Sequence, residues 1–225
     1  MILDSNFALR REDVETHFRC LDFITSVESH RQIPILDPST SHQLNVDLQM
    51  QCCLKAQTLI LLYNMVESTT CECLNFIYDT VADEGLLYSD LTDKMRRMWT
   101  SSYKRAGREE HKWGEGLKMP LKAEFVGIAT NTSGNIDIRK IYDIFNDHGC
   151  VIAETKREEY GRSFLTVKNK RNLLAHGNVS FSQCGSTFLF SDLDKMRRDI
   201  TDFLMIVIET TKLFVHNKEY KRGPE

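Results

Sequence analysis

The feature that most constrains the fold of this chain is a helical pattern about forty residues long. From about Leu44 to Asp83, apolar residues recur every three or four positions, and the stretch contains neither proline nor glycine. Through Leu59 to Tyr63 the pattern is apolar on more than one face. It therefore predicts a central, buried helix.

Shorter helical patterns lie on both sides of the central one, and they predict an all-α fold. The helices are expected over Arg10–His30, about 90–106, Asp137–His148, 158–176 and Ser191–Tyr220. Ser191 and Asp194 resemble a capping box at the start of the last helix. Residues 31–43 contain Pro34, Pro38 and a Ser-Thr-Ser run, so they are expected to form a loop.

Two segments depart from the helical pattern. Residues 106–136 carry five glycines, Pro120 and a polar run, and they predict an irregular insertion with a possible β element at 123–129. Apolar residues on both sides of Gly185 suggest a short β hairpin or a covered loop over about 178–190. The length of 225 residues fits a single domain over 1–225.

Two short segments of the chain resemble each other. Residues 89–97 (Ser-Asp-Leu-Thr-Asp-Lys-Met-Arg-Arg) and residues 191–198 (Ser-Asp-Leu-Asp-Lys-Met-Arg-Arg) differ by one inserted threonine. A structural repeat would span a whole supersecondary unit, whereas this similarity covers about ten residues. We therefore predict two similar helix starts rather than a repeat.

Composition bounds the class of protein. Hydrophobic residues at 41% and charged residues at 27% describe a soluble globular chain with a real core. The N-terminus has no secretory signal, and no apolar run could cross a membrane, so we expect a cytoplasmic protein. The chain has seven cysteines, and four of them form the close pairs Cys52-Cys53 and Cys71-x-Cys73. Neither pair has the Cys-x-x-Cys spacing of a zinc or redox site, so we expect buried, reduced thiols.

Several enzyme classes are excluded by their motifs. The sequence has no glycine-rich phosphate loop, no His-Glu-x-x-His and no nucleophile elbow, which removes nucleotide hydrolases, zinc proteases and α/β-hydrolases. We predict no metal site and no cofactor. Six histidines lack partners at ligand spacing and are expected at the surface: His17, His30, His42, His111, His148 and His216.

Charge is distributed unevenly along the chain. The net charge is −3, yet residues 94–108 hold six basic residues and no acid, with Trp99 and Tyr103 between them. Residues 156–171 hold six basic residues and two acids. Local positive segments on a mildly acidic protein suit an anionic partner touched by a defined cleft. The alternative is that both segments are solvated helix faces.

The most informative chemistry lies in Arg171–Gly177 (Arg-Asn-Leu-Leu-Ala-His-Gly), at the end of a predicted helix. Asn172 and His176 are four residues apart, so they share one helix face, and Lys168 extends that stripe one turn earlier. Arg171 adds a planar cation suited to a phosphate. Gly177 suits the position after a helix, which places His176 where the helix dipole favours positive charge. The set could cleave a phosphodiester.

The structural alternative is ordinary helix capping, because His-Gly ends many helices and Arg and Asn are usually solvated. The wider sequence favours chemistry. The motif resembles that of HEPN-type ribonucleases, and further similarity lies in residues 61–68 (Leu-Leu-Tyr-Asn-Met-Val-Glu-Ser), residues 133–137 and Phe181. The chain is similar to stand-alone bacterial HEPN-like nucleases often encoded near toxin–antitoxin or restriction loci.

This resemblance implies an all-α, HEPN-like bundle that forms a homodimer, with two Arg-Asn-x-x-x-His motifs facing one RNA cleft. It implies metal-independent endoribonuclease activity, giving 2′,3′-cyclic phosphate and 5′-hydroxyl ends, in a toxin or defence effector with an antitoxin or another defence protein as partner. A non-catalytic HEPN module that binds RNA or nucleotides, or serves assembly, is the alternative.

The chemistry suggests a role for each candidate residue. His176 could move protons at neutral pH, Arg171 could stabilise charge on phosphate oxygens, and Asn172 could orient the phosphate or the imidazole. Substrate contacts are assigned to Lys168, Glu67, Arg97 and Lys104. A carboxylate on an apolar helix face needs a partner, so we expect Glu67 to pair with a motif Arg or His, or else to be solvent-exposed.

Overall fold

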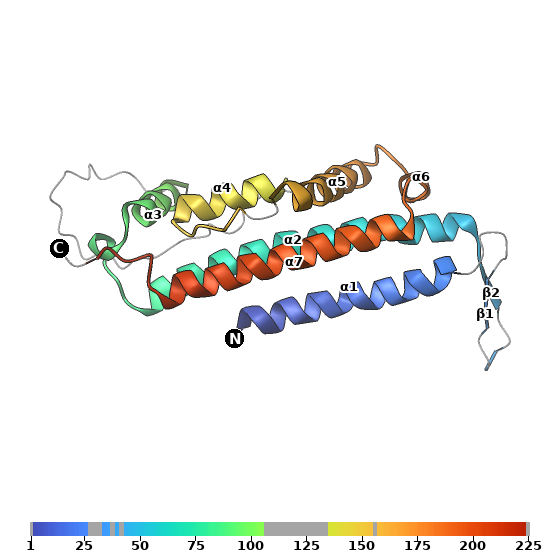
Figure 1. The fold of residues 1–225 in the computed structure, drawn as a ribbon, viewed down its shortest axis with the longest axis horizontal. Coiled ribbons are helices and arrows are strands. Elements are labelled where there is room, and N and C mark those ends of the chain that lie inside the picture. Colours follow the sequence, from blue (N-terminus) through green and yellow to red (C-terminus); the bar gives the residue numbers. More distant parts are fainter. Residues whose placement is uncertain are drawn as a thin grey trace. The chain divides into compact units, whose positions relative to one another are not determined.

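The computed structural model describes residues 2–26, 33–36, 39–40, 43–105, 135–154 and 157–223. Over these residues it contains the helices α1 to α7, a 3-10 turn and a small two-stranded sheet, so the all-α prediction is confirmed (Figure 1). None of the described helices is apolar over enough of its length to cross a bilayer.

The chain divides into two compact units. Unit 1 comprises Met1–Val66 with Glu158–Asp202, and unit 2 comprises Glu67–Arg157 with Phe203–Glu225. The long central helix predicted from the sequence is confirmed as α2 (Leu48–Asp83), and both α2 and α7 (Phe190–His216) contribute residues to both units. The single domain over 1–225 stays a prediction.

In unit 1, α1 (Ile2–Ser26) packs on α2 and on α7. Nε2 of His17 is 2.9 Å from Oγ1 of Thr58 and 3.2 Å from the carbonyl oxygen of Leu54. Arg197 of α7 pairs with Glu15 and lies over the ring of Phe18. The helix begins eight residues before the predicted Arg10, because buried Leu3 and Phe7 continue the spacing of Val14 and Phe18.

The expected loop over residues 31–43 was wrong. Strands β1 (Ile33–Leu36) and β2 (Gln43–Val46) form an antiparallel pair in which Ile33 faces Val46. Val46 is buried against Ile24 with Met50 and Leu54 beside it, which gives the hairpin a core contact. Pro34 is tolerated because both strands of a two-stranded sheet are edge strands. The sequence predicted a loop because strands of four residues are too short to show an alternating pattern, and the two prolines indicated a turn.

The expected β hairpin at 178–190 was also wrong. The structure has the short helix α6 (Phe181–Gly185), preceded by Ser180 as N-cap. The Ser180 hydroxyl accepts from the amide of Gln183 at 3.2 Å, and the Gln183 side chain accepts from the amide of Ser180 at 3.2 Å. This reciprocal pair is a capping box and explains why the aromatic run turns helical.

The last helix, α7, begins at Phe190, and its cap differs from the predicted one. The carboxylate of Asp192 accepts from the amide of Leu189 at 2.9 Å, whereas Asp194 binds Arg197 and Arg198. The predicted Ser191–Asp194 capping box was therefore wrong by two residues. The helix dipole and the free amides favour an acid in this first turn, and Asp192 supplies it.

The resemblance between residues 89–97 and 191–198 corresponds to a shared local structure, as predicted. In the first copy the carboxylate of Asp90 accepts from the amide of Leu87 at 2.8 Å, which is the geometry of Asp192 with Leu189. The leucine that follows the acid, Leu91 or Leu193, is fully buried in both copies. The inserted threonine separates the turn η1 (Tyr88–Asp90) from α3 (Asp93–Arg105) in the first copy, whereas α7 continues directly.

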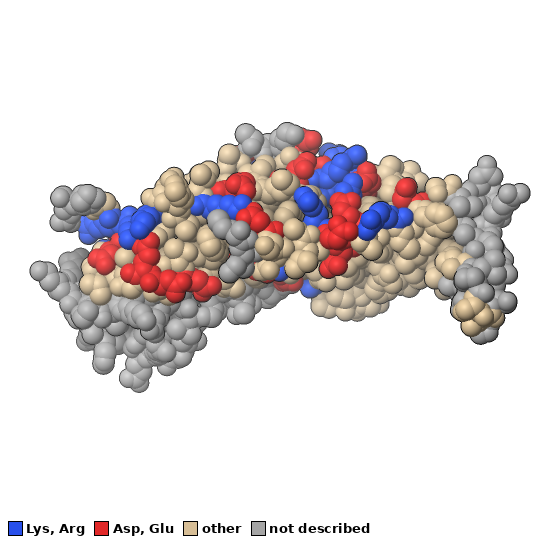
Figure 2. Space-filling view, turned by 90° about the horizontal axis from the view of Figure 1, so that it is seen from below, with Lys and Arg blue, Asp and Glu red and all other residues tan. Residues whose placement is uncertain are grey.

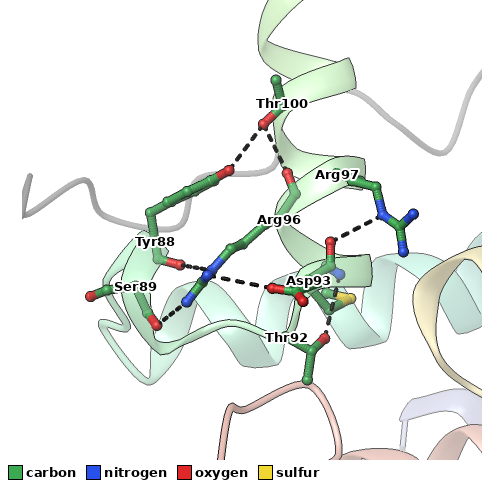
Figure 3. Close-up of polar contacts among 8 residues, drawn as sticks. Tyr88, Ser89, Thr92, Asp93, Arg96, Arg97 and Thr100 are labelled. Atoms are coloured by element: carbon green, nitrogen blue, oxygen red, sulfur yellow. Dashed lines mark hydrogen bonds and ion pairs between the residues drawn. The ribbon is translucent and has the colours of Figure 1, made fainter. Parts of the chain in front are cut away.

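The start of α3 in unit 2 is shown in Figure 3. Arg96 reaches back across the turn: its Nε donates to the carbonyl oxygen of Tyr88 at 3.1 Å, and its guanidinium lies over the Tyr88 ring. The same guanidinium pairs with Asp93 at 3.5 Å, and Nε of Arg97 donates to the carbonyl oxygen of Asp93 at 3.3 Å. Two cations of the predicted basic segment therefore stabilise this turn.

In the rest of unit 2, α4 (Ile138–His148) packs against α2 and against the second half of α7. Asp137 caps α4 by accepting from the amide of Lys140 at 3.1 Å, and Gly149 ends it with φ of 89°. The boundaries predicted for this helix are confirmed. The predicted insertion at 106–136 falls on residues outside the described ranges except for 135–136, and the β element at 123–129 lies wholly outside them.

His148 was expected at the surface, but it is buried. Its Nδ1 donates to the carbonyl oxygen of Ile144 at 2.7 Å, and its Nε2 accepts from the Tyr78 hydroxyl. Burial lowers the pKa of the imidazole below its ordinary 6.5, against smaller opposing effects of that carbonyl and of Asp147. His17 is half-buried, and His216 is exposed as predicted, whereas burial of the remaining three lies outside the described residues.

The prediction of buried, free thiols is confirmed at four of the seven cysteines. All seven cysteines are free, and Cys52, Cys73, Cys150 and Cys184 are buried. Burial raises the pKa of the Cys150 thiol to about 12, which keeps it protonated and unreactive. Cys20 on α1 is exposed, and Cys53 and Cys71 on α2 are only half-buried, so these three depart from the prediction.

Candidate functional site

The motif residues lie at the end of α5 (Arg157–Ala175) in unit 1, as the sequence predicted. The amide of His176 donates to the carbonyl oxygen of Asn172 at 3.0 Å, so the helical turn extends to His176. Asn172 and His176 therefore share one face, with Lys168 one turn earlier. Asn172 and Lys168 are half-buried, and His176 is exposed.

The end of α5 has the geometry expected from Gly177. Its φ is 69°, and its amide donates to the carbonyl oxygen of Leu174 at 3.1 Å. The amide of Asn178 donates to the carbonyl oxygen of Leu173 at 2.9 Å. These two bonds form a Schellman motif, which turns the chain away sharply after His176. The imidazole is thus presented at a fixed, exposed helix end.

Arg171 is oriented by two neighbours. Its Cζ lies 4.3 Å from the centroid of the Tyr63 ring, which belongs to α2 and is 1% exposed. Its Nη1 donates to Oδ1 of Asn172 at 3.2 Å. A guanidinium stacked on an aromatic face keeps its plane parallel to that face, and its edge then carries the hydrogen bonds. Two of the three motif side chains are therefore in direct contact.

The helix that carries the motif is fixed to the core by an apolar and a polar face. Its buried residues include Tyr160, Phe164, Val167 and Leu174, the stripe predicted from the sequence. Ser163 donates to Oδ2 of Asp199 on α7 at 2.5 Å, and Lys195 pairs with the same carboxylate oxygen at 2.8 Å. The buried carboxylate thus has the partners that its burial requires.

The segment after the motif is also anchored in unit 1. Nζ of Lys55 on α2 donates to the carbonyl oxygen of Phe188 at 3.1 Å, and Nζ of Lys170 lies 5.7 Å from the centroid of the Phe188 ring. A Cβ atom on Gly185 would lie 1.7 Å from the carbonyl oxygen of Cys52, so α6 sits directly on the backbone of α2. These contacts limit the positions that the chain after His176 can take.

The other predicted site residues lie on α2 and α3. Glu67 is half-buried on α2, and Arg97 is exposed on α3 with its Nε bound to a backbone carbonyl. Lys104 belongs to α3, but its side chain lies outside the described part of the structure. All three belong to unit 2, whereas the motif belongs to unit 1. Their contact with a substrate stays a prediction.

Charges on the visible surface are mixed. In Figure 2, Lys and Arg side chains alternate with Asp and Glu side chains, and no broad patch of one sign covers the described residues on that face. Among the described residues, no group of three or more His, Cys, Asp and Glu side chains could hold a metal ion. The side chains of the motif are a guanidinium, an amide and an imidazole, and none of them is a carboxylate or a thiolate.

The comparison with protein families decides the assignment. A family model described as HEPN_MAE_28990-like HEPN matches residues 5–220. The chain belongs to this HEPN family. The match spans both compact units and includes the whole Arg-Asn-x-x-x-His motif. Among curated proteins and among solved structures, no match to this HEPN chain was found.

Tyr63 is the site residue that sequence reasoning missed in this HEPN protein. It was noted in the apolar pattern of the central helix and in residues 61–68, which resemble HEPN nucleases, but its ring was given no role. The available signal was a tyrosine on the central helix together with an arginine in a motif helix, since Arg and aromatic rings often stack. Nothing in the helical period says which two helices meet, so the pairing of Tyr63 with Arg171 required the structure.

Proposed function

We propose that this HEPN protein is a metal-independent endoribonuclease and that Arg171, Asn172 and His176 form its active site. The observation that carries the proposal is the arrangement at the end of α5, where a stacked guanidinium, its bound amide and an exposed imidazole gather within two helical turns. Each group has a task in RNA cleavage, and none of them requires a metal ion.

The reaction is an attack of a ribose 2′-oxygen on the adjacent phosphorus. The P–O5′ bond breaks, and the products carry a 2′,3′-cyclic phosphate and a 5′-hydroxyl. A base removes the proton of the 2′-hydroxyl and an acid supplies a proton to the departing 5′-oxygen, and an imidazole can do either near neutral pH. His176 is assigned to this proton transfer.

The remaining charge builds on the non-bridging phosphate oxygens. A guanidinium with its plane and edge fixed in advance stabilises such charge without reorganising during the reaction. Arg171 takes this role, and Asn172 holds one edge of the guanidinium through its Oδ1 atom. Lys168, one turn earlier on the same face, adds a phosphate contact.

A homodimer completes the site in this proposal. One imidazole cannot act as base and acid on opposite sides of the same phosphate, whereas a two-fold axis brings a second copy of each residue automatically. The resemblance to stand-alone HEPN nucleases near toxin–antitoxin and restriction loci supports a role as a toxin or defence effector. Its partner would be an antitoxin or another defence protein.

The proposal is tested by incubating the purified protein with total RNA in the presence of EDTA. We expect fragments with the wild type, and losses of rate of about a hundredfold or more with Arg171→Ala and with His176→Ala. Asn172→Ala should have a smaller effect, because it acts through Arg171. Wild-type protein that leaves all RNA intact at every concentration would favour a non-catalytic HEPN module that binds RNA or serves assembly.

A further inference from the structure

The contact between Tyr63 and Arg171 joins the core of unit 1 to the motif. Tyr63 lies on α2 among Leu59, Leu62 and Val66, all of them buried. A ring enclosed in this way has little freedom to move, because interiors are packed close to crystal density. Arg171, in contrast, is half-buried at the end of α5, and long side chains at such places usually sample many rotamers.

The ring therefore restrains the guanidinium of Arg171. With Cζ 4.3 Å from the centroid of the Tyr63 ring and Nη1 bound to Asn172, the guanidinium is held at two points. The attraction between a cation and a ring face increases where water is excluded, and Tyr63 is 1% exposed. This stack ties the motif arginine to α2.

We propose that Tyr63 is a positioning residue that orients Arg171 for the reaction through the face of its ring. The proposal rests on the nuclease function proposed above. It predicts a lower rate of the chemical step when the ring is removed. A misplaced cation loses more of its interaction with the transition state than of its interaction with the bound substrate. The hydroxyl group of Tyr63 is not needed for this role.

The test compares Tyr63→Phe with Tyr63→Leu, two variants that both lack the hydroxyl and differ in the ring. Cleavage of a defined RNA oligonucleotide is followed at a temperature where circular dichroism shows each variant folded. Relative to Tyr63→Phe, we expect Tyr63→Leu to lower kcat about tenfold while KM changes by no more than about twofold. Phe7→Leu, which shortens a buried aromatic residue on α1 of the same unit, serves as the control.

A second readout does not depend on cleavage. The Nε–H resonance of Arg171, assigned by its disappearance in Arg171→Lys, should carry a ring-current shift in the wild type and in Tyr63→Phe. The shift should disappear in Tyr63→Leu and persist in Phe7→Leu. If the wild-type protein leaves RNA uncut, the nuclease proposal fails, and this resonance still decides whether Tyr63 orients Arg171.

Three results would overturn the positioning role. The first is an equal kcat for Tyr63→Leu and Tyr63→Phe while His176→Ala abolishes cleavage, which would leave the nuclease proposal intact. The second is a fall in kcat for Phe7→Leu as large as that for Tyr63→Leu, because any lost core ring would then have the same effect. The third is an Arg171 resonance that Tyr63→Leu leaves unchanged.

Discussion

A Cβ atom on Gly185 would lie 1.7 Å from the carbonyl oxygen of Cys52, which is too close for any side chain at position 185. The contact is with backbone, so a neighbouring side chain cannot turn away to relieve it. Gly185 is thus the point at which α6 rests on α2, directly after the motif. Its requirement is close approach, whereas Gly177 is required for its positive φ.

Gly185→Ala should therefore destabilise the protein by about 3 kcal/mol, because the added methyl group must push α6 away from α2. Urea denaturation followed by circular dichroism measures the loss. Gly223→Ala is the matched control, since a Cβ there would meet nothing within 4 Å, and it should cost less than about 0.5 kcal/mol. Equal stability of the two variants would mean that α6 does not pack as described.

The buried His148 makes stability depend on pH in a defined direction. Its folded pKa lies below the ordinary 6.5, so the unfolded chain binds more protons as the pH falls below that value. The stability that comes from keeping His148 neutral should be fully present above about pH 6.5 and should decline toward about pH 5. His17, whose pKa burial also lowers, contributes in the same direction.

The measurement is the free energy of unfolding of wild type and His148→Gln at about pH 7.5 and about pH 5.5. We expect the wild type to lose more stability between these two values than the variant does, because the variant has no imidazole to protonate. An identical pH dependence would show that His148 is not the buried, neutral group described here.

Glu84 in unit 2 forms a cluster with the end of the chain. Its carboxylate pairs with Lys221 at 2.5 Å and Lys218 at 2.9 Å, and it accepts from the Tyr220 hydroxyl at 2.9 Å. The bonds from Lys221 and Lys218 lower the pKa of Glu84 to about 2. The carboxylate therefore stabilises the fold above its ordinary pKa of about 4.5, and this contribution is lost as the pH falls toward 2.

Glu84→Gln should lower the midpoint of thermal unfolding at neutral pH, because it removes the charge that holds both lysines. Glu209→Gln is the matched control: Glu209 pairs with Lys212, but its side chain is 65% exposed, and such pairs stabilise little. Scanning calorimetry should show a drop for the first variant and almost none for the second. A drop of the same size in both would remove the special role of the Glu84 cluster.

How far the sequence could predict this structure depended on the length of each element. The helices α2, α4 and α5 each show several turns of apolar period, and their bounds were predicted closely. The strands β1 and β2 and the helix α6 are four or five residues long, too short for a period to appear. Their structure depends on packing against α2 and on the capping box of Ser180 with Gln183.

The candidate site divides in the same way. The positions of Asn172 and His176 on one face and the turn at Gly177 follow from helix geometry and from glycine's access to positive φ. The stack of Arg171 on Tyr63 joins residues far apart in the chain, and local spacing does not encode it. His148 was misplaced for a similar reason, since its burial depends on Tyr78 of another helix.

Subunit exchange tests the proposed dimer. Wild-type protein is mixed with increasing amounts of His176→Ala and allowed to exchange before RNA is added. Paired sites should lose activity out of proportion to dilution, because mixed dimers hold only one imidazole. Independent sites would keep the activity of the wild-type fraction, and a monomer at micromolar concentration in light scattering would also count against pairing.

The chemistry of the cut ends tests the central claim most directly. A defined RNA is incubated with wild type or with folded His176→Ala in the presence of EDTA, and the product ends are identified by mass spectrometry. We expect 2′,3′-cyclic phosphate and 5′-hydroxyl ends from the wild type alone. Ends bearing a 3′-hydroxyl and a 5′-phosphate, or the expected ends formed equally fast by His176→Ala, would contradict cleavage by this motif.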